Sequence, residues 1–81
     1  MTAEQGRLKA IRQRLSLSQS EFARELGLTL RGVQDIEAGI GKERAAYVMA
    51  AEYLALRIAV AREAPELAGE ETRRLAKELK A

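Results

Sequence analysis

The chain of 81 residues contains no cysteine and no histidine, and its only aspartate is Asp35. It therefore lacks the common ligands of zinc and other transition metals, and it has no histidine that could activate a nucleophile. We expect neither an enzyme nor a protein that holds a metal ion or another cofactor, and we expect no small-molecule substrate. The absence of cysteine also excludes a disulfide framework.

Proline occurs once, and aromatic residues make up only 4% of the chain. So few aromatic rings exclude a stacking platform for single-stranded nucleic acid. The N-terminal sequence MTAEQGRLKA has no apolar stretch of the length that a signal peptide needs, so we expect a cytoplasmic protein. Residues 43–63 are largely apolar, but Glu52 and Arg57 interrupt them, which argues against a membrane span.

Apolar residues make up 47% of the chain and charged residues 32%, a composition typical of a folded protein rather than a disordered one. A single domain of this length buries only about 60 to 65% of its unfolded surface, so help from a second subunit is expected. The many alanine, leucine, arginine and glutamate residues predict an all-α fold. The net charge of +2 is by itself weak support for nucleic-acid binding.

The first helix is predicted over residues 3–15, opened by the capping-box spacing of Thr2 and Gln5. Its buried face is formed by three residues at helical spacing: Leu8, Ile11 and Leu15. Ser16 interrupts this helix before the next segment begins.

Residues 18–39 contain the most informative pattern of the chain. Two short amphipathic segments meet at Gly27, which tolerates the positive φ of a sharp turn. Ala23 is small enough for two helices to cross closely, and Val33 and Ile36 are spaced to bury the second helix. This spacing predicts a helix-turn-helix, whose second helix reads DNA.

Both helices of this motif have start and stop signals. Ser18 and Glu21 repeat the capping-box spacing, and Thr29 is a cap for the second helix. Three residues of the first helix are expected to be buried: Phe22, Ala23 and Leu26. The sequence Gly39-Ile40-Gly41 ends the second helix.

A fourth, long helix is predicted over residues 43–63, where apolar residues occur on nearly every side. One face would cover the first three helices and the other would meet a second subunit. Pro65 is expected to start a fifth helix. One face of the fifth helix carries four residues: Ala68, Thr72, Leu75 and Leu79. We thus divide one domain into a helix-turn-helix part, residues 1–41, and a dimerisation part, residues 42–81.

The segment LKAIRQRLSLSQSEFARELGLTLRGVQDIEAG resembles the Cro/C1-type, or Xre-type, helix-turn-helix repressors of phages and bacteria. The resemblance implies a five-helix, lambda-repressor-like bundle. It lapses after Gly39, because one long helix replaces the two short helices of most members. The LKAIR segment, Arg31, Gln34 and the long fourth helix together resemble the short repressors associated with anti-CRISPR operons.

The resemblance implies two groups of DNA contacts. Four residues of the second motif helix are assigned to base reading: Leu30, Arg31, Gln34 and Asp35. Five residues are assigned to phosphate contact: Ser18, Gln19, Thr29, Lys42 and Arg44.

Several of these assignments have structural alternatives. Arg31 can bind guanine bidentately, or form an ion pair with Asp35 one turn on. Gln19 contacts a phosphate or is simply solvated, and Lys42 and Arg44 contact the DNA backbone or are ordinary surface residues.

Two further alternatives come from the charges and apolar residues of the same helix. Leu30 touches a thymine methyl group or packs against a neighbouring helix. Asp35 could accept from a cytosine amino group or repel phosphates.

In this family an arginine of the first helix pairs with the glutamate that ends the third. The resemblance therefore implies a salt bridge between Arg12 and Glu37 that holds the reading helix without contacting bases. The dimer interface is assigned to eight residues: Tyr47, Ala50, Tyr53, Leu54, Arg57, Ile58, Leu75 and Leu79.

The leading hypothesis is a homodimeric transcriptional repressor that binds an inverted-repeat DNA operator, with half-sites about 34 Å apart. It would regulate its own gene or a neighbouring one, such as a phage or anti-CRISPR operon. Alternatively, the chain is an antitoxin whose residues 66–80 cover a toxin partner. A third reading is a protein-interaction module without DNA affinity, supported by the four carboxylates against two arginines in residues 18–39.

Overall fold

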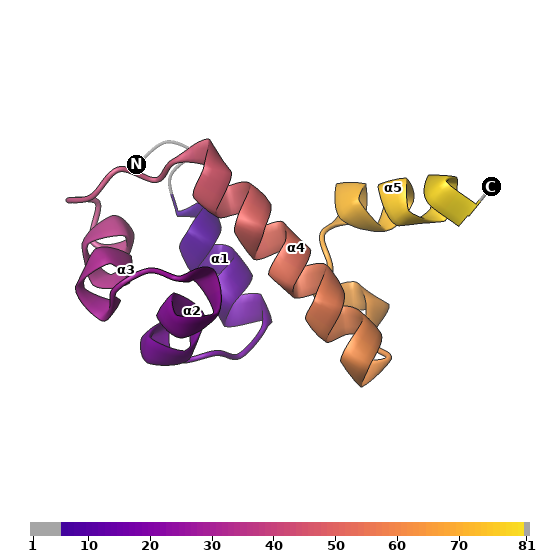
Figure 1. The fold of residues 1–81 in the computed structure, drawn as a ribbon, viewed down its shortest axis with the longest axis horizontal. Helices are drawn as coiled ribbons and strands as arrows, with labels where there is room; N and C mark the ends of the chain where they lie inside the picture. The colour runs from indigo at the N-terminus through magenta and orange to yellow at the C-terminus, as the bar shows by residue number, and fades with distance from the viewer. Residues whose placement is uncertain (1–5, 81) are drawn as a thin grey trace.

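The computed structural model describes residues 6–80, which form helices and no strand. The elements are α1 (Arg7–Arg14), α2 (Gln19–Leu26), α3 (Leu30–Glu37), α4 (Ala45–Arg62), a 3₁₀ turn η1 (Pro65–Leu67) and α5 (Glu70–Lys80). The molecule measures 41 × 24 × 17 Å, with α3 at one end of the long axis and α5 at the other (Figure 1). The all-α fold with five α-helices agrees with the sequence prediction.

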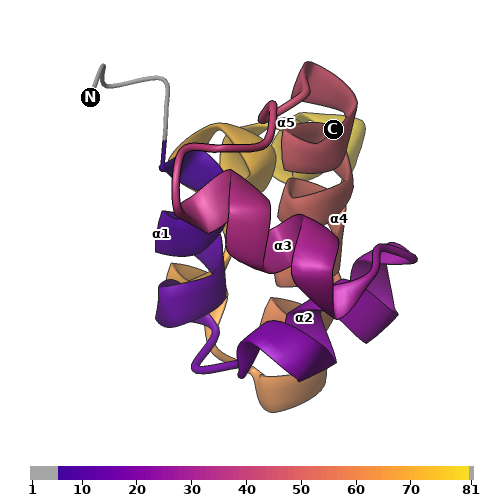
Figure 2. The same cartoon turned by 90° about the vertical axis from the view of Figure 1, so that its left-hand side faces the viewer.

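Helices α1 and α2 pack against α4, and α3 packs against α2, so that the four helices together enclose the core. Seen from the α3 end, α3 lies in front of the other elements, with α1 and α2 around it (Figure 2). The core is built from ten buried residues: Leu8, Ile11, Leu15, Phe22, Ala23, Val33, Val48, Ala51, Leu54 and Ala55. Since α4 supplies four of them, both parts of the predicted division share one core.

The two helices of the motif begin where their caps predict. The Ser18 hydroxyl accepts from the Glu21 amide at 3.0 Å, and the Glu21 carboxylate accepts from the Ser18 amide at 2.8 Å. The Thr29 hydroxyl accepts from the Gly32 amide at 2.9 Å. Gly27 ends α2 with φ 74° and turns the chain into α3.

The start of α1 differs from the prediction. Gly6 has φ 87°, which no right-handed helix accommodates, so the helix begins at Arg7 instead of residue 3. The expected capping pair Thr2 and Gln5 lies outside the described residues. Instead, the Leu8 amide donates to the Glu43 carboxylate at 2.7 Å, so a residue from the loop before α4 caps α1.

The fifth helix also starts later than predicted. Pro65 opens η1 rather than α5, and Ala68 follows in an extended conformation, with φ −85° and ψ 151°. Ala68 is therefore not on the α5 face assigned to it but is buried against α4, at 2% exposure. In the part of the chain from residue 6 to residue 80, no helix has the length and apolar content needed to cross a bilayer.

Polar contacts join the far end of α4 to α1. The Arg14 guanidinium donates to the Glu52 carboxylate at 3.0 Å and to the Leu67 carbonyl at 2.9 Å. Arg62 donates to the Leu15 carbonyl at 3.5 Å. These bonds fix α4 and η1 relative to α1, whereas α5 extends beyond them (Figure 1).

Candidate nucleic-acid interface

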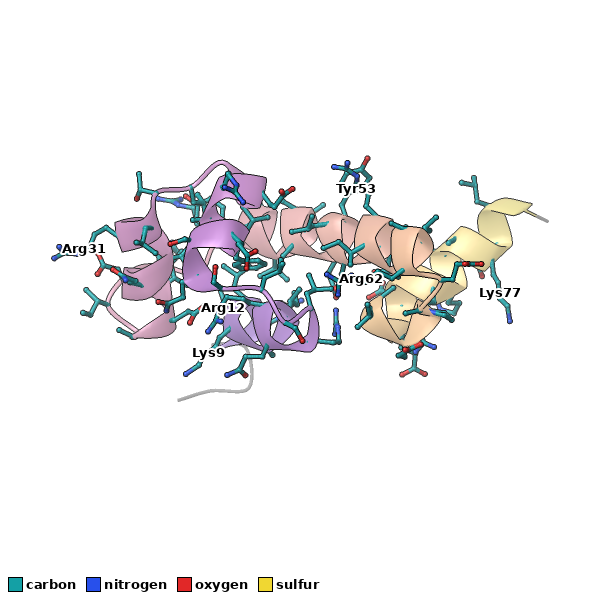
Figure 3. The ribbon with its side chains drawn as sticks, turned by 90° about the horizontal axis from the view of Figure 1, so that it is seen from below. Lys9, Arg12, Arg31, Tyr53, Arg62 and Lys77 are labelled. Atoms are coloured by element: carbon teal, nitrogen blue, oxygen red, sulfur yellow. The ribbon has the colours of Figure 1, made fainter. Side chains whose placement is uncertain are left out.

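The outward side of α3 carries the residues assigned to base reading. Val33 anchors the inner side at 2% exposure, because it belongs to the buried core that α3 shares with α2. On the opposite side, the Arg31 side chain is 84% exposed, Gln34 is exposed and Leu30 is 42% exposed. Figure 3 shows Arg31 projecting from this end of the molecule. The surface is thus free to meet a ligand.

Arg31 and Asp35 form an ion pair within α3, with the Arg31 Nε atom 3.3 Å from the Asp35 Oδ1 atom. The bond uses Nε and leaves the two Nη groups of the guanidinium outside it. An exposed pair of this kind contributes only about 0.2 to 0.5 kcal/mol to helix stability. It therefore orients Arg31 without strongly restraining it.

The amino ends of α2 and α3 are both exposed. Ser18 and Thr29, the two cap residues, lie on the surface with their hydroxyls bonded to the third amide of each helix. The remaining free amides of a helix's first turn, together with the helix dipole, favour a negatively charged group. Both ends have the chemistry that phosphate contact requires.

Gln19 makes a contact that neither alternative from the sequence, phosphate contact or simple solvation, had included. Its amide nitrogen donates to the Glu37 Oε1 atom at 3.0 Å, so the side chain lies against the end of α3 and is half-buried. It is neither simply solvated nor fully available, and only its carbonyl and remaining N–H can contact a phosphate.

Arg12 and Glu37 form the ion pair that the resemblance implied. Two bonds join them, Nε to Oε2 at 2.6 Å and Nη2 to Oε1 at 2.8 Å, and the side chains are 15% and 6% exposed. Arg12 also donates to the Leu17 carbonyl at 3.0 Å. Together with the bond from Gln19, this network joins α1, α2 and the end of α3. It therefore fixes the orientation of α3 relative to α1 and α2.

The network also changes the acidity of its members. Burial raises the pKa of Glu37, but the hydrogen bonds from Arg12 and Gln19 and the charges of Arg12 and Lys9 outweigh it and lower the pKa. The hydrogen bond to Glu37 raises the pKa of Arg12 above its ordinary value. The pair is therefore fully charged at neutral pH.

The loop after α3 presents two basic residues on the surface. Asp35 ends the helix by accepting from the amides of Ile40 and Gly41 through its carbonyl, both at 2.9 Å. Glu43 turns inward to cap α1, while its neighbours Lys42 and Arg44 are exposed. No sequence pattern pointed to Glu43, because its partner lies 35 residues away.

The residues assigned to a dimer interface separate into two groups. Leu54 is 6% exposed and belongs to the core of the single chain, so its assignment to an interface was wrong: it faces α1 and α2. Tyr47 and Ile58 are partly buried against the same core. Five of the assigned residues are exposed: Ala50, Tyr53, Arg57, Leu75 and Leu79.

Comparison with known proteins gave one match. Residues 8–45 match the family model of helix-turn-helix domains. The matched segment begins in α1, includes α2, α3 and the following loop, and ends at the first residue of α4. Neither the comparison with curated proteins nor that with solved structures found a match.

Proposed function

Because this chain belongs, through residues 8–45, to the Cro/C1-type helix-turn-helix family of DNA-binding transcription regulators, we propose that it is a homodimeric repressor of an inverted-repeat operator. In this proposal α3 enters the major groove of each half-site, and repression acts on its own gene or a neighbouring operon. The observation that carries it is the exposed side of α3 with Arg31 and Gln34 at its centre.

The acidic balance of residues 18–39 weighs less against DNA binding than the sequence suggested. Three of its four carboxylates are engaged within the protein: Glu21 caps α2, Asp35 pairs with Arg31, and Glu37 pairs with Arg12. Engaged carboxylates repel phosphates less than free ones, because a positive partner or a helix end lies beside them. This favours a DNA-binding protein over an interaction module.

Arg31 is the main base-reading residue in the proposed complex. Its two Nη groups lie outside the bond to Asp35 and match the O6 and N7 acceptors of a guanine. Asp35 then acts by holding the guanidinium rather than by accepting from a cytosine. Gln34, one turn from Leu30, reads a neighbouring base, and Leu30 provides an apolar contact for a thymine methyl group.

The phosphate contacts surround this helix. The ends of α2 and α3, at Ser18 and Thr29, bind one strand, and the exposed Lys42 and Arg44 follow the other side of the groove. Gln19 adds a phosphate contact through the part of its amide that Glu37 does not use. Log K for the operator is then expected to fall by about 0.9 per log unit of salt for each phosphate neutralised.

A mobility-shift titration with the DNA upstream of the gene tests the proposal. Arg31→Ala is expected to weaken operator binding about five- to 150-fold, since a good bidentate contact contributes about 1 to 3 kcal/mol. Arg74→Ala is a matched control, because Arg74 is also exposed and also pairs one turn on, with Glu78. Equal affinities of the Arg31→Ala protein and the wild type would contradict the reading mechanism.

A further inference from the structure

The loop between α3 and α4, residues 38–44, is bonded to the protein at both of its ends; we call it the exit loop. At α3, the Asp35 carbonyl accepts from the Ile40 and Gly41 amides, both at 2.9 Å. The backbone packs so closely there that a Cβ at Gly41 would stand 3.2 Å from the Ile36 amide nitrogen. The loop then passes over the amino end of α1 before it enters α4 (Figure 2). It therefore lies at the same end of the molecule as α3.

Glu43 makes the contact between the exit loop and α1. Its carboxylate accepts from the Leu8 amide at 2.7 Å, and its side chain is partly buried. The cap position of α1 is Gly6, which has no side chain with which to cap the helix. A free amide in the first turn and the positive end of the helix dipole both favour a carboxylate at this point. The bond thus joins the exit loop to a residue 35 positions earlier in the chain.

The direction of the Glu43 side chain decides the directions of its neighbours. Residues 42–44 lie outside the helices, and Arg44 is extended, with φ −75° and ψ 145°. In extended backbone, successive side chains point to opposite sides. Because Glu43 is directed inward to α1, Lys42 and Arg44 are directed outward, and both are exposed. One carboxylate turned inward therefore gives residues 42–44 an outward surface of positive charge.

We propose that Glu43 is a positioning residue for DNA binding. Its bond to the Leu8 amide holds the exit loop so that Lys42 and Arg44 meet the phosphate backbone beside α3. This inference rests on the proposed function, in which both basic residues contact phosphates. It adds to that function a residue that touches no DNA and has the same sign of charge as DNA, yet is needed for tight binding.

The proposal reverses the effect that charge alone predicts for Glu43. Removing a carboxylate from a DNA-binding surface strengthens binding when the carboxylate does nothing but repel phosphates. If Glu43 positions the exit loop, its removal weakens binding instead. The loop loses its bond to α1, and the directions of Lys42 and Arg44 must then be fixed at the moment when DNA binds, which costs binding free energy.

Mobility-shift titrations of the operator at about 0.1 M salt test this sign. One phosphate contact contributes up to about eightfold to the binding constant at this salt concentration, so Glu43→Ala is expected to bind about fivefold more weakly than the wild type, or weaker still. Glu43→Gln keeps an oxygen that accepts from the Leu8 amide, and we expect it to bind at least as tightly as the wild type. Glu25→Ala is the matched control, because it removes an exposed carboxylate from α2 and should not weaken binding.

Two further measurements separate positioning of the exit loop from a loss of stability. The slope of log K against log salt should decrease in magnitude by about 0.9 for each phosphate contact that Glu43→Ala releases. A partly unfolded protein would instead lower the affinity without changing this slope. In a protein that already carries Lys42→Ala and Arg44→Ala, adding Glu43→Ala should weaken binding little further, because residues that act through one another are not additive.

Three results would overturn the inference while leaving the proposed function intact. The first is a Glu43→Ala protein that binds the operator as tightly as the wild type or more tightly. The second is a Glu43→Gln protein that binds no better than Glu43→Ala. The third is an equal loss of affinity from Glu43→Ala in the protein without Lys42 and Arg44. If the wild type itself binds no operator, the proposed function fails and the inference fails with it.

Discussion

The two ends of this molecule are completed in different ways. At the α3 end, side chains cap α1, α2 and α3, and the buried charges of Arg12 and Glu37 satisfy each other. At the other end, α4 stops at Glu63 in a left-handed conformation, and Leu75 and Leu79 of α5 face water. The first end is therefore held in a fixed shape by side-chain bonds within one chain, whereas at the second end α5 carries exposed leucines that no such network holds.

Breaking the network behind α3 has the largest expected effect. Glu37→Ala leaves the Arg12 guanidinium buried without its carboxylate, which costs about 3 to 5 kcal/mol. For a domain of this size that lowers the Tm by more than about 12 °C, at about 4 °C or more per kcal/mol. Thermal denaturation followed by circular dichroism measures the change.

The exposed pair of the same helix is the control for this prediction. Asp35→Ala removes the partner of Arg31, whose side chain is 84% exposed, and is expected to cost less than about 0.5 kcal/mol. If Glu37→Ala and Asp35→Ala shift the Tm equally, the distinction between a buried and an exposed pair does not hold here.

Acid should weaken the α3 end selectively. The pKa of Glu37 is lower in the folded state than its ordinary value of about 4.3, so the folded protein binds fewer protons than the unfolded one. The stability that this difference contributes is complete above about pH 4.3 and is lost as the pH falls through the lowered pKa.

We expect the wild-type Tm to hold at mildly acidic pH and to fall below about pH 4. Glu37→Gln has no carboxylate to protonate at this position. Its Tm should be lower at neutral pH and should fall less over the same pH range. Other carboxylates, such as Glu21, titrate in both proteins. If the Tm of the wild type and that of Glu37→Gln fall by the same amount as the pH is lowered, the role given to Glu37 is wrong.

The accuracy of the sequence predictions also divides along the chain. The caps at Ser18 and Thr29 and the turn at Gly27 were predicted, because each depends on residues within one turn of the chain. The Arg12 and Glu37 pair followed from the family resemblance, not from local pattern. The cap from Glu43 to Leu8 depends on tertiary packing and has no local signal.

The α4 and α5 region was harder to predict, for a physical reason. Apolar residues on nearly every side of α4 leave no periodicity from which to separate core from surface, so Leu54 was assigned to the wrong side. Pro65 fits the first turn of either an α-helix or a 3₁₀ turn, and its sequence does not distinguish them. The contacts of the folded chain decide both cases.

The smallest expected changes in stability come from substitutions at the carboxyl ends of α2 and α4. Both stop with a left-handed residue, Gly27 with φ 74° and Glu63 with φ 52°. A Cβ at Gly27 would meet nothing within 4 Å, so Gly27→Ala tests conformation alone and is expected to cost about 1 kcal/mol.

Glu63→Gly is the reverse exchange at the other end. It relieves about 1 to 2 kcal/mol of strain in a left-handed glutamate, but it also adds about 0.4 to 1 kcal/mol of unfolded-chain entropy, so the net gain should be about 1 kcal/mol or less. Urea midpoints of the two variants measure both changes. A large gain from Glu63→Gly would mean that backbone strain is concentrated at the end of α4. The difference between the α3 end and the α5 end would then include the backbone as well as the side chains.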